Sequence, residues 1–154
     1  LEAIFRRFQG GDRISLFPEH LTFENGEEVK RLIGTEAIAA LIHDADGRLD
    51  RDFHIFFDML VDGGAVVIDD FADERRFKPV CERYPFGGTK KLRTFRLASQ
   101  LIDWDLIEPE AVVGYTLFAR KLPGATAARI EPEVEHAINR EVRAEYERRR
   151  ASEH

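Results

Sequence analysis

The sequence predicts an α/β domain with a largely parallel sheet. Short apolar runs alternate with amphipathic helical patterns, the order typical of β-α-β units. Two of these runs, Ala37–Ile42 and Ala65–Ile68, have a single helical pattern between them. A right-handed crossover and parallel pairing of the two strands are therefore expected.

The composition excludes several functional classes. A chain of 154 residues suits one domain, and 44% hydrophobic with 34% charged residues is typical of a globular protein. Lys+Arg is 23 against Asp+Glu 29, so no nucleic-acid surface is predicted. No apolar run approaches the ~18–20 residues of a membrane span. The single cysteine, Cys81, excludes an intrachain disulfide framework, and no signal-peptide pattern is present. We therefore expect a cytoplasmic protein.

The first elements are predicted from turn and cap signals. Residues 13–17 predict a short strand that Pro18 ends. Asn25 predicts a helix N-cap with Glu28 as its capping-box partner, and Gly34 predicts the end of that helix.

A β-α-β unit is predicted next. The run Ala37–Ile42 predicts a strand buried on both faces. Asp50 is the predicted cap of an amphipathic helix, which Gly63-Gly64 should end, and Ala65–Ile68 should form the second buried strand. The helix is expected to place five apolar residues in the core: Phe53, Phe56, Phe57, Leu60 and Val61.

An antiparallel hairpin is expected toward the C-terminus. Residues 92–101 predict a helix, followed by strands at Trp104–Ile107 and Ala111–Arg120. The link through Pro109-Glu110 is too short for a crossover, which favours antiparallel pairing.

The last segment is predicted to be a linker and a charged helix. We divide the chain into an α/β part, residues 1–122, and this segment, residues 123–154. Pro132 is placed as the first residue of the helix. A solvated helix packed along a thin apolar stripe is expected, and a homodimer contact is the alternative. The stripe consists of Val134, Ile138, Val142 and Tyr146.

Acidic residues follow both apolar strands. Asp44 and Asp46 come after the first strand, and Asp69 and Asp70 after the second. Neighbouring parallel strands end at the same edge of a sheet, ~4.8 Å apart, so these carboxylates should converge. Crowded carboxylates stay ionised most readily around a cation, and hard oxygen ligands suit Mg²⁺, Ca²⁺ or Mn²⁺. Capping of helices and ending of strands is the alternative interpretation.

Other residues give weaker signals. His43 abuts the acidic residues and is a candidate ligand or base, although a hydrogen bond to backbone at the strand end is the favoured interpretation. His20 and His54 show no partner pattern. Cys81 is expected to be an inert thiol.

Residues 39–47, taken together with residues 60–71, resemble the second half of a class I S-adenosylmethionine-dependent methyltransferase. The small-molecule O-methyltransferase branch is the most similar. There the fourth strand ends in Asp, and a Gly-Gly turn leads into a fifth strand that ends in an acidic pair. Residues 113–121 are similar to the last strand of the antiparallel hairpin of that fold. The resemblance covers residues 12 to 121.

The resemblance implies a Rossmann-like parallel sheet with a C-terminal antiparallel hairpin, with S-adenosylmethionine as cofactor. It further implies that Asp44, Asp69 and Asp70 hold Mg²⁺ or another divalent cation. Such a metal binds a small-molecule hydroxyl substrate, lowers the pKa of the hydroxyl and orients it for attack on the methyl group. The base is unassigned, because Gly47 stands where members of the family carry Lys or His.

The cofactor-binding strands of the family are not found upstream of Arg13. At ~30 residues per β-α-β unit, roughly 60 residues would hold them. We therefore expect the C-terminal part of a methyltransferase that lacks the N-terminal cofactor-binding strands. From the part at hand, contacts to the cofactor are predicted by position for Glu19, His20, Ala45 and Asp46.

Two alternatives stay open. Asp44-Ala45-Asp46 is an Asp-x-Asp sequence of the kind with which nucleotide-sugar glycosyltransferases hold a metal and a diphosphate. A non-catalytic α/β metal-binding or regulatory module is the other.

Overall fold

The computed structural model describes residues 19–34, 37–44, 47–72 and 85–152. It separates into two compact units, Leu1–Glu36 and Ala37–His154. The predicted strand at 13–17 and Cys81 lie outside the described residues. Within the described ranges, none of the helices has the length and hydropathy that crossing a membrane would require.

The first unit contains helix α2 (Gly26–Ile33), with Asn25 as N-cap and Gly34 after its last residue. The predicted ends of this helix are confirmed, but the predicted capping box is wrong. Thr22 N donates to Asn25 Oδ1 at 2.8 Å, and Asn25 N donates to Thr22 Oγ1 at 3.2 Å. The reciprocal pair thus forms one turn earlier, because Thr22 offers the same three-residue spacing. The N–H of Glu28 donates to the carbonyl of Asn25 instead.

A four-stranded sheet is the centre of the second unit, with strand order β1-β2-β4-β3 among the described residues. Strands β1 and β2 are parallel, whereas β2–β4 and β3–β4 are antiparallel. The α/β class is confirmed, but the sheet is mixed rather than largely parallel. The strands are β1 (Ile38–His43), β2 (Leu60–Ile68), β3 (Ile107–Val113) and β4 (Thr116–Lys121).

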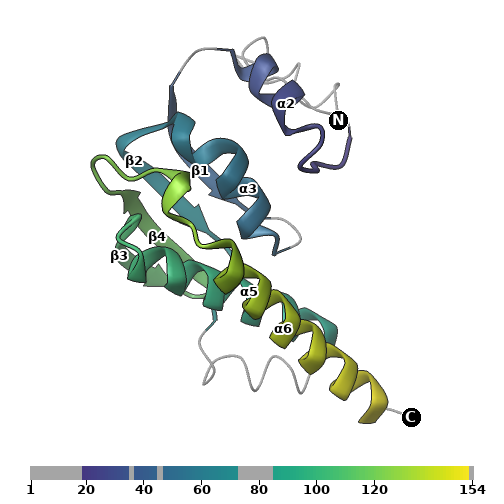
Figure 1. Cartoon of the computed structure of the whole chain (residues 1–154). Coiled ribbons are helices and arrows are strands. Elements are labelled where there is room, and N and C mark those ends of the chain that lie inside the picture. Colours follow the sequence, from purple (N-terminus) through teal and green to yellow (C-terminus); the bar gives the residue numbers. More distant parts are fainter. Residues whose placement is uncertain (1–18, 35–36, 45–46, 73–84, 153–154) are drawn as a thin grey trace, which may run out of the picture. The chain divides into compact units, whose positions relative to one another are not determined.

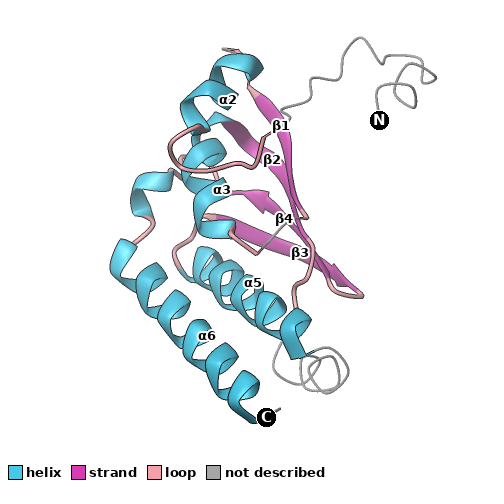
Figure 2. Ribbon diagram, turned by 90° about the vertical axis from the view of Figure 1, so that its right-hand side faces the viewer, coloured by secondary structure: helices cyan, strands magenta, loops and turns pink. Residues whose placement is uncertain are grey.

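Helices α3, α5 and α6 lie on one side of this sheet, and α6 runs beside α5 (Figures 1 and 2). The predicted start of the last helix at Pro132 is confirmed. The core lies between helices and sheet, where the rings of Phe53 and Phe57 stack at 5.2 Å and both are fully buried. The helical elements are α3 (Leu49–Phe56), η2 (Phe57–Met59), α5 (Pro85–Asp103), η3 (Ala127–Arg129) and α6 (Pro132–Ser152).

Strand β1 is not buried on both faces, contrary to the prediction from its apolar run. It lies at an edge of the sheet, and Ile42 is 70% exposed. Ile42 pairs with Val67 of β2, which in turn pairs with Phe118 of β4, and Phe118 is exposed too. These residues form an apolar row on the face opposite the described helices of this unit. A continuous apolar run therefore did not indicate a strand that is buried on both faces.

The junction between α3 and β2 differs from the predicted one. Arg48, not Asp50, is the N-cap of α3, and the α-helix already ends at Phe56. Leu60 begins β2, so the helical spacing of the apolar residues extends beyond the end of the helix into the strand. Gly63 does not end a helix. It lies within β2, in a bulge where two steps along β1 match five along β2.

The hairpin is present, but its turn lies elsewhere. Val113 pairs with Thr116, so the turn consists of Gly114-Tyr115. Gly114 has a φ of +62°, a backbone conformation that glycine adopts without steric cost. Pro109 lies inside β3 and is tolerated because β3 is an edge strand.

The bulge in β2 predicts a specific sensitivity to added side-chain atoms. A Cβ on Gly64 would lie 2.8 Å from both Leu60 Cδ1 and the Val61 carbonyl oxygen. We expect Gly64→Ala to lower the free energy of unfolding by about 1–3 kcal/mol in urea titrations. Gly63→Ala is the matched variant, because nothing lies within 4 Å of its Cβ and only its φ of +73° is unfavourable. A Gly64→Ala variant as stable as the wild type would contradict the described bulge.

Candidate metal centre

The parallel ladder brings the ends of β1 and β2 together. Asp69 N donates to the carbonyl of His43 at 2.9 Å, so the pairing continues to the last residues of both strands. One carboxylate oxygen each of Asp44, Asp69 and Asp70 lies within 4.8 Å of the others. Asp44 is exposed and the other two are half-buried. The three residues for which a metal role was predicted thus form one acidic cluster.

Asp70 takes part in this cluster because the chain turns there. Consecutive residues of a strand point to opposite faces, so Asp69 and Asp70 could not both face one point in regular β-structure. Asp70 has a φ of +59°, in the left-handed region. That region costs L-residues in general about 1–2 kcal/mol, and aspartate tolerates it better than most. The strained turn directs both carboxylates to the same place.

Protein groups already contact two of the carboxylates. Thr116 Oγ1 donates to Asp69 Oδ1 at 2.8 Å. Lys90 and Lys91 form ion pairs with the two oxygens of Asp70, one lysine to each. The lysines lie in α5, about twenty residues after Asp70 along the chain, and sequence reasoning missed them. Only their position near the start of a helix after the acidic strand end could have indicated them.

The donor set fits a hard divalent cation. Two oxygens bound to one Ca²⁺ at about 2.4 Å lie at most about 4.8 Å apart, and Mg²⁺ requires a closer approach. Three carboxylate oxygens within 4.8 Å therefore need little movement to share one ion. A cation that binds Asp70 must compete there with the ammonium groups of Lys90 and Lys91.

Of the four predicted cofactor contacts, two lie in the first unit and two lie outside the described residues. Glu19 and His20 are exposed residues of the first unit. Ala45 and Asp46 lie outside the described residues. The prediction for these four residues stays a prediction.

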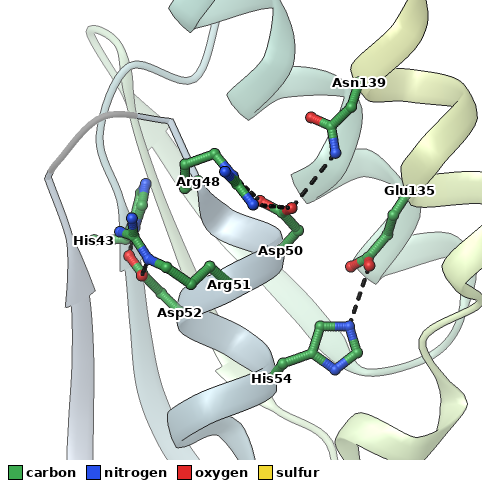
Figure 3. A network of polar contacts seen from close by, with 8 residues as sticks. All are labelled: His43, Arg48, Asp50, Arg51, Asp52, His54, Glu135 and Asn139. Carbon is green, nitrogen blue, oxygen red and sulfur yellow. Dashed lines mark hydrogen bonds and ion pairs between the residues drawn. The ribbon is translucent and has the colours of Figure 1, made fainter. Parts of the chain in front are cut away.

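His43 is held by a side chain rather than by backbone, so the favoured interpretation of this histidine is wrong. Its ring is buried, and Nδ1 lies 2.7 Å from Asp52 Oδ2. Arg51 Nε donates to the other oxygen of Asp52 at 2.7 Å. The contact joins His43, the last residue of β1, to Asp52 of α3 (Figure 3). It therefore fixes the end of the strand that Asp44 follows. Asp52 lies nine residues from His43, and the sequence offered no signal for the pairing.

A second set of polar contacts joins α3 to α6 (Figure 3). Arg48 binds Asp50 through two hydrogen bonds of 3.0 and 3.1 Å, and Asn139 Nδ2 lies 3.4 Å from Asp50 Oδ2. His54 Nε2 lies 3.1 Å from Glu135 Oε2. The hydrogen bond with Glu135 raises the pKa of His54 above its ordinary value of 6.5, against the opposing effect of burial.

Comparison with known proteins yields no match for this chain among family models, curated proteins or solved structures. The function is therefore argued from the geometry of the site and from the sequence pattern.

The His54–Glu135 contact predicts a pH-dependent contribution to stability. A raised pKa in the folded state means that the contribution is fully present below about pH 6.5 and is lost as pH rises through the folded-state pKa. We expect His54→Gln to cost about 0.5 kcal/mol at pH 6, since the pair is partly exposed, and less at pH 8.5. His136→Gln, an exposed histidine of α6, is the control. A cost for His54→Gln that stays constant from pH 6 to 8.5 in urea titrations would contradict the contact.

Proposed function

We propose that the chain is part of an S-adenosylmethionine-dependent methyltransferase in which a divalent cation assists O-methylation of a small-molecule hydroxyl. The observation that carries the proposal is the convergence of Asp44, Asp69 and Asp70 at the ends of two parallel strands. These are the residues that the family resemblance assigns to the metal.

The arrangement of the strands supports the proposal. A parallel pair, β1 and β2, is followed by an antiparallel hairpin, as the resemblance implies for the second half of the fold. Among the described residues β1 has a partner on one side only. Its other edge is therefore available to further strands of a Rossmann-like sheet.

The residues of the cluster would bind and orient the reactants. Asp44, Asp69 and Asp70 would hold Mg²⁺ or a similar ion, which would supply Lewis-acid chemistry toward the substrate hydroxyl. S-adenosylmethionine supplies the electrophilic methyl group when it is bound. The hydroxyl of Thr116 fixes one oxygen of Asp69 and leaves the other for a ligand. The exposure of Asp44 leaves a path from solvent for an acceptor molecule.

One observation favours a second candidate, a non-catalytic regulatory module that holds no metal. Lys90 and Lys91 compensate the charge of Asp70 without any metal. If these ion pairs are permanent, the acidic cluster stabilises the strand ends and binds no cation. Metal titration separates the two candidates.

Titration of Mn²⁺ into the chain is the test of the metal centre. We expect one Mn²⁺ per chain by calorimetry, and weakening of at least about tenfold in Asp44→Asn or Asp69→Asn. Loss of a supporting outer residue typically weakens metal binding 10–100-fold, so loss of a direct ligand should cost no less. Lys91→Met should strengthen binding, because it removes a competing positive charge.

Asp103→Asn is the matched control, since Asp103 is an exposed aspartate at the end of α5. It should leave Mn²⁺ binding unchanged. Absence of binding by the wild-type chain, or equal losses in Asp103→Asn and Asp44→Asn, would favour the non-catalytic module.

Cofactor binding tests the reaction class. We expect the full-length protein to bind S-adenosylhomocysteine, and a double variant, Asp44→Asn with Asp69→Asn, to lose Mg²⁺-dependent methyl transfer while it keeps its circular dichroism spectrum. Binding of a UDP-sugar instead of S-adenosylhomocysteine would favour a glycosyltransferase. Methyl transfer that persists in the double variant or with chelator would remove the metal from the reaction.

A further inference from the structure

A groove with a volume of about 650 Å³ lies outside the acidic cluster, where α5, α6 and the start of α3 meet. Small-molecule sites in proteins typically have volumes of about 300–1,000 Å³. The groove has therefore the size of a binding site for a small ligand. None of the three aspartates of the acidic cluster lines it.

The charge of the groove is opposite to that of the chain. Among the described residues, its charged lining consists of four arginines and one carboxylate, Glu147, whereas the chain has a net charge of −6. The arginines are Arg48, Arg93, Arg143 and Arg150. Like charges gathered in one groove repel one another, and an anion bound among them relieves the repulsion.

Two of these arginines are only partly compensated. The ion pair of Arg143 with Glu147, 3.1 Å long, is exposed and therefore weak. Arg150 forms no ion pair with any described residue. Arg48 is oriented by its two hydrogen bonds with Asp50 (Figure 3). Asp50 also accepts a hydrogen bond from Asn139, which lines the groove. The groove thus combines a positioned guanidinium at the N-cap of α3 with accessible guanidinium groups on α6.

The arrangement favours phosphate over carboxylate. Guanidinium groups line the groove from the N-cap of α3, from α5 and from α6 rather than from one plane, and a tetrahedral phosphate presents oxygens in several directions. Tyr146 adds a phenol ring to the lining. We infer that this arginine-lined groove between α5 and α6 binds a phosphorylated small molecule, at a site separate from the acidic cluster.

Calorimetric titration of inorganic pyrophosphate into the full chain tests the inference. Saturable binding is expected, with about tenfold weaker affinity in Arg150→Ala and in Arg143→Ala, since each loses a charge-assisted hydrogen bond. Glu147→Gln should bind more tightly, because it removes a negative charge, that of the one carboxylate that the described part of the lining contains. Added salt should weaken binding. All three side chains are exposed, so the variants should keep the wild-type circular dichroism spectrum.

Arg140→Ala is the matched control, an exposed arginine of α6 that does not line the groove. It should leave the affinity unchanged. Equal losses in Arg140→Ala and Arg150→Ala would overturn the inference in favour of general attraction to a basic helix. Absence of saturable binding, or tighter binding of citrate than of pyrophosphate, would overturn it as well. These results are independent of whether the acidic cluster binds metal.

Discussion

The parallel pairing of β1 with β2 is the constraint on which the candidate site depends. Asp44 and Asp69 are far apart along the chain, and the ladder alone places their carboxylates at one edge of the sheet. Strand β2 also pairs with β4, whose first residue, Thr116, donates to Asp69. The buried Lys121 of β4 donates to the carbonyl of Leu60, the first residue of β2, and to that of Phe57 in η2 just before it. The central strand is therefore held at both ends by β4.

Helix α5 connects the two charged regions of the second unit. Lys90 and Lys91 pair with Asp70 of the acidic cluster, whereas Thr89 and Arg93 line the arginine groove. Residues four apart share one face of a helix, and the residues between them point elsewhere. The first half of α5 therefore presents cations to an anionic cluster on one side and to a groove for external anions on the other.

The sequence predicted those features of the fold that short-range residue patterns determine. The parallel pair, the existence of the hairpin, the start of α6 at Pro132 and the position of the acidic residues at strand ends all follow from short-range signals. The helical spacing of apolar residues predicts that Leu60 belongs to the helix, which is wrong. Leu60 packs in the same core as the helical residues before it, so its apolar character gives no signal that the chain changes there from helix to strand. The predicted turn at Pro109-Glu110 is wrong, because an edge strand tolerates proline and Gly114 supplies the turn.

Contacts between distant segments could not be predicted. His54 binds Glu135, 81 residues away, and Asp70 binds two lysines of the next helix. One sequence has no signal for such pairs, because they depend on how helices pack and not on spacing along the chain.

Anomalous diffraction from a crystal grown with Mn²⁺ would test most directly the central claim, that the three aspartates hold a divalent cation. The account predicts a peak at about 2.2 Å from one oxygen of each of Asp44, Asp69 and Asp70, a distance between those of Mg²⁺ and Ca²⁺. Lysine ammonium groups still on Asp70, with no peak at the cluster, would contradict it.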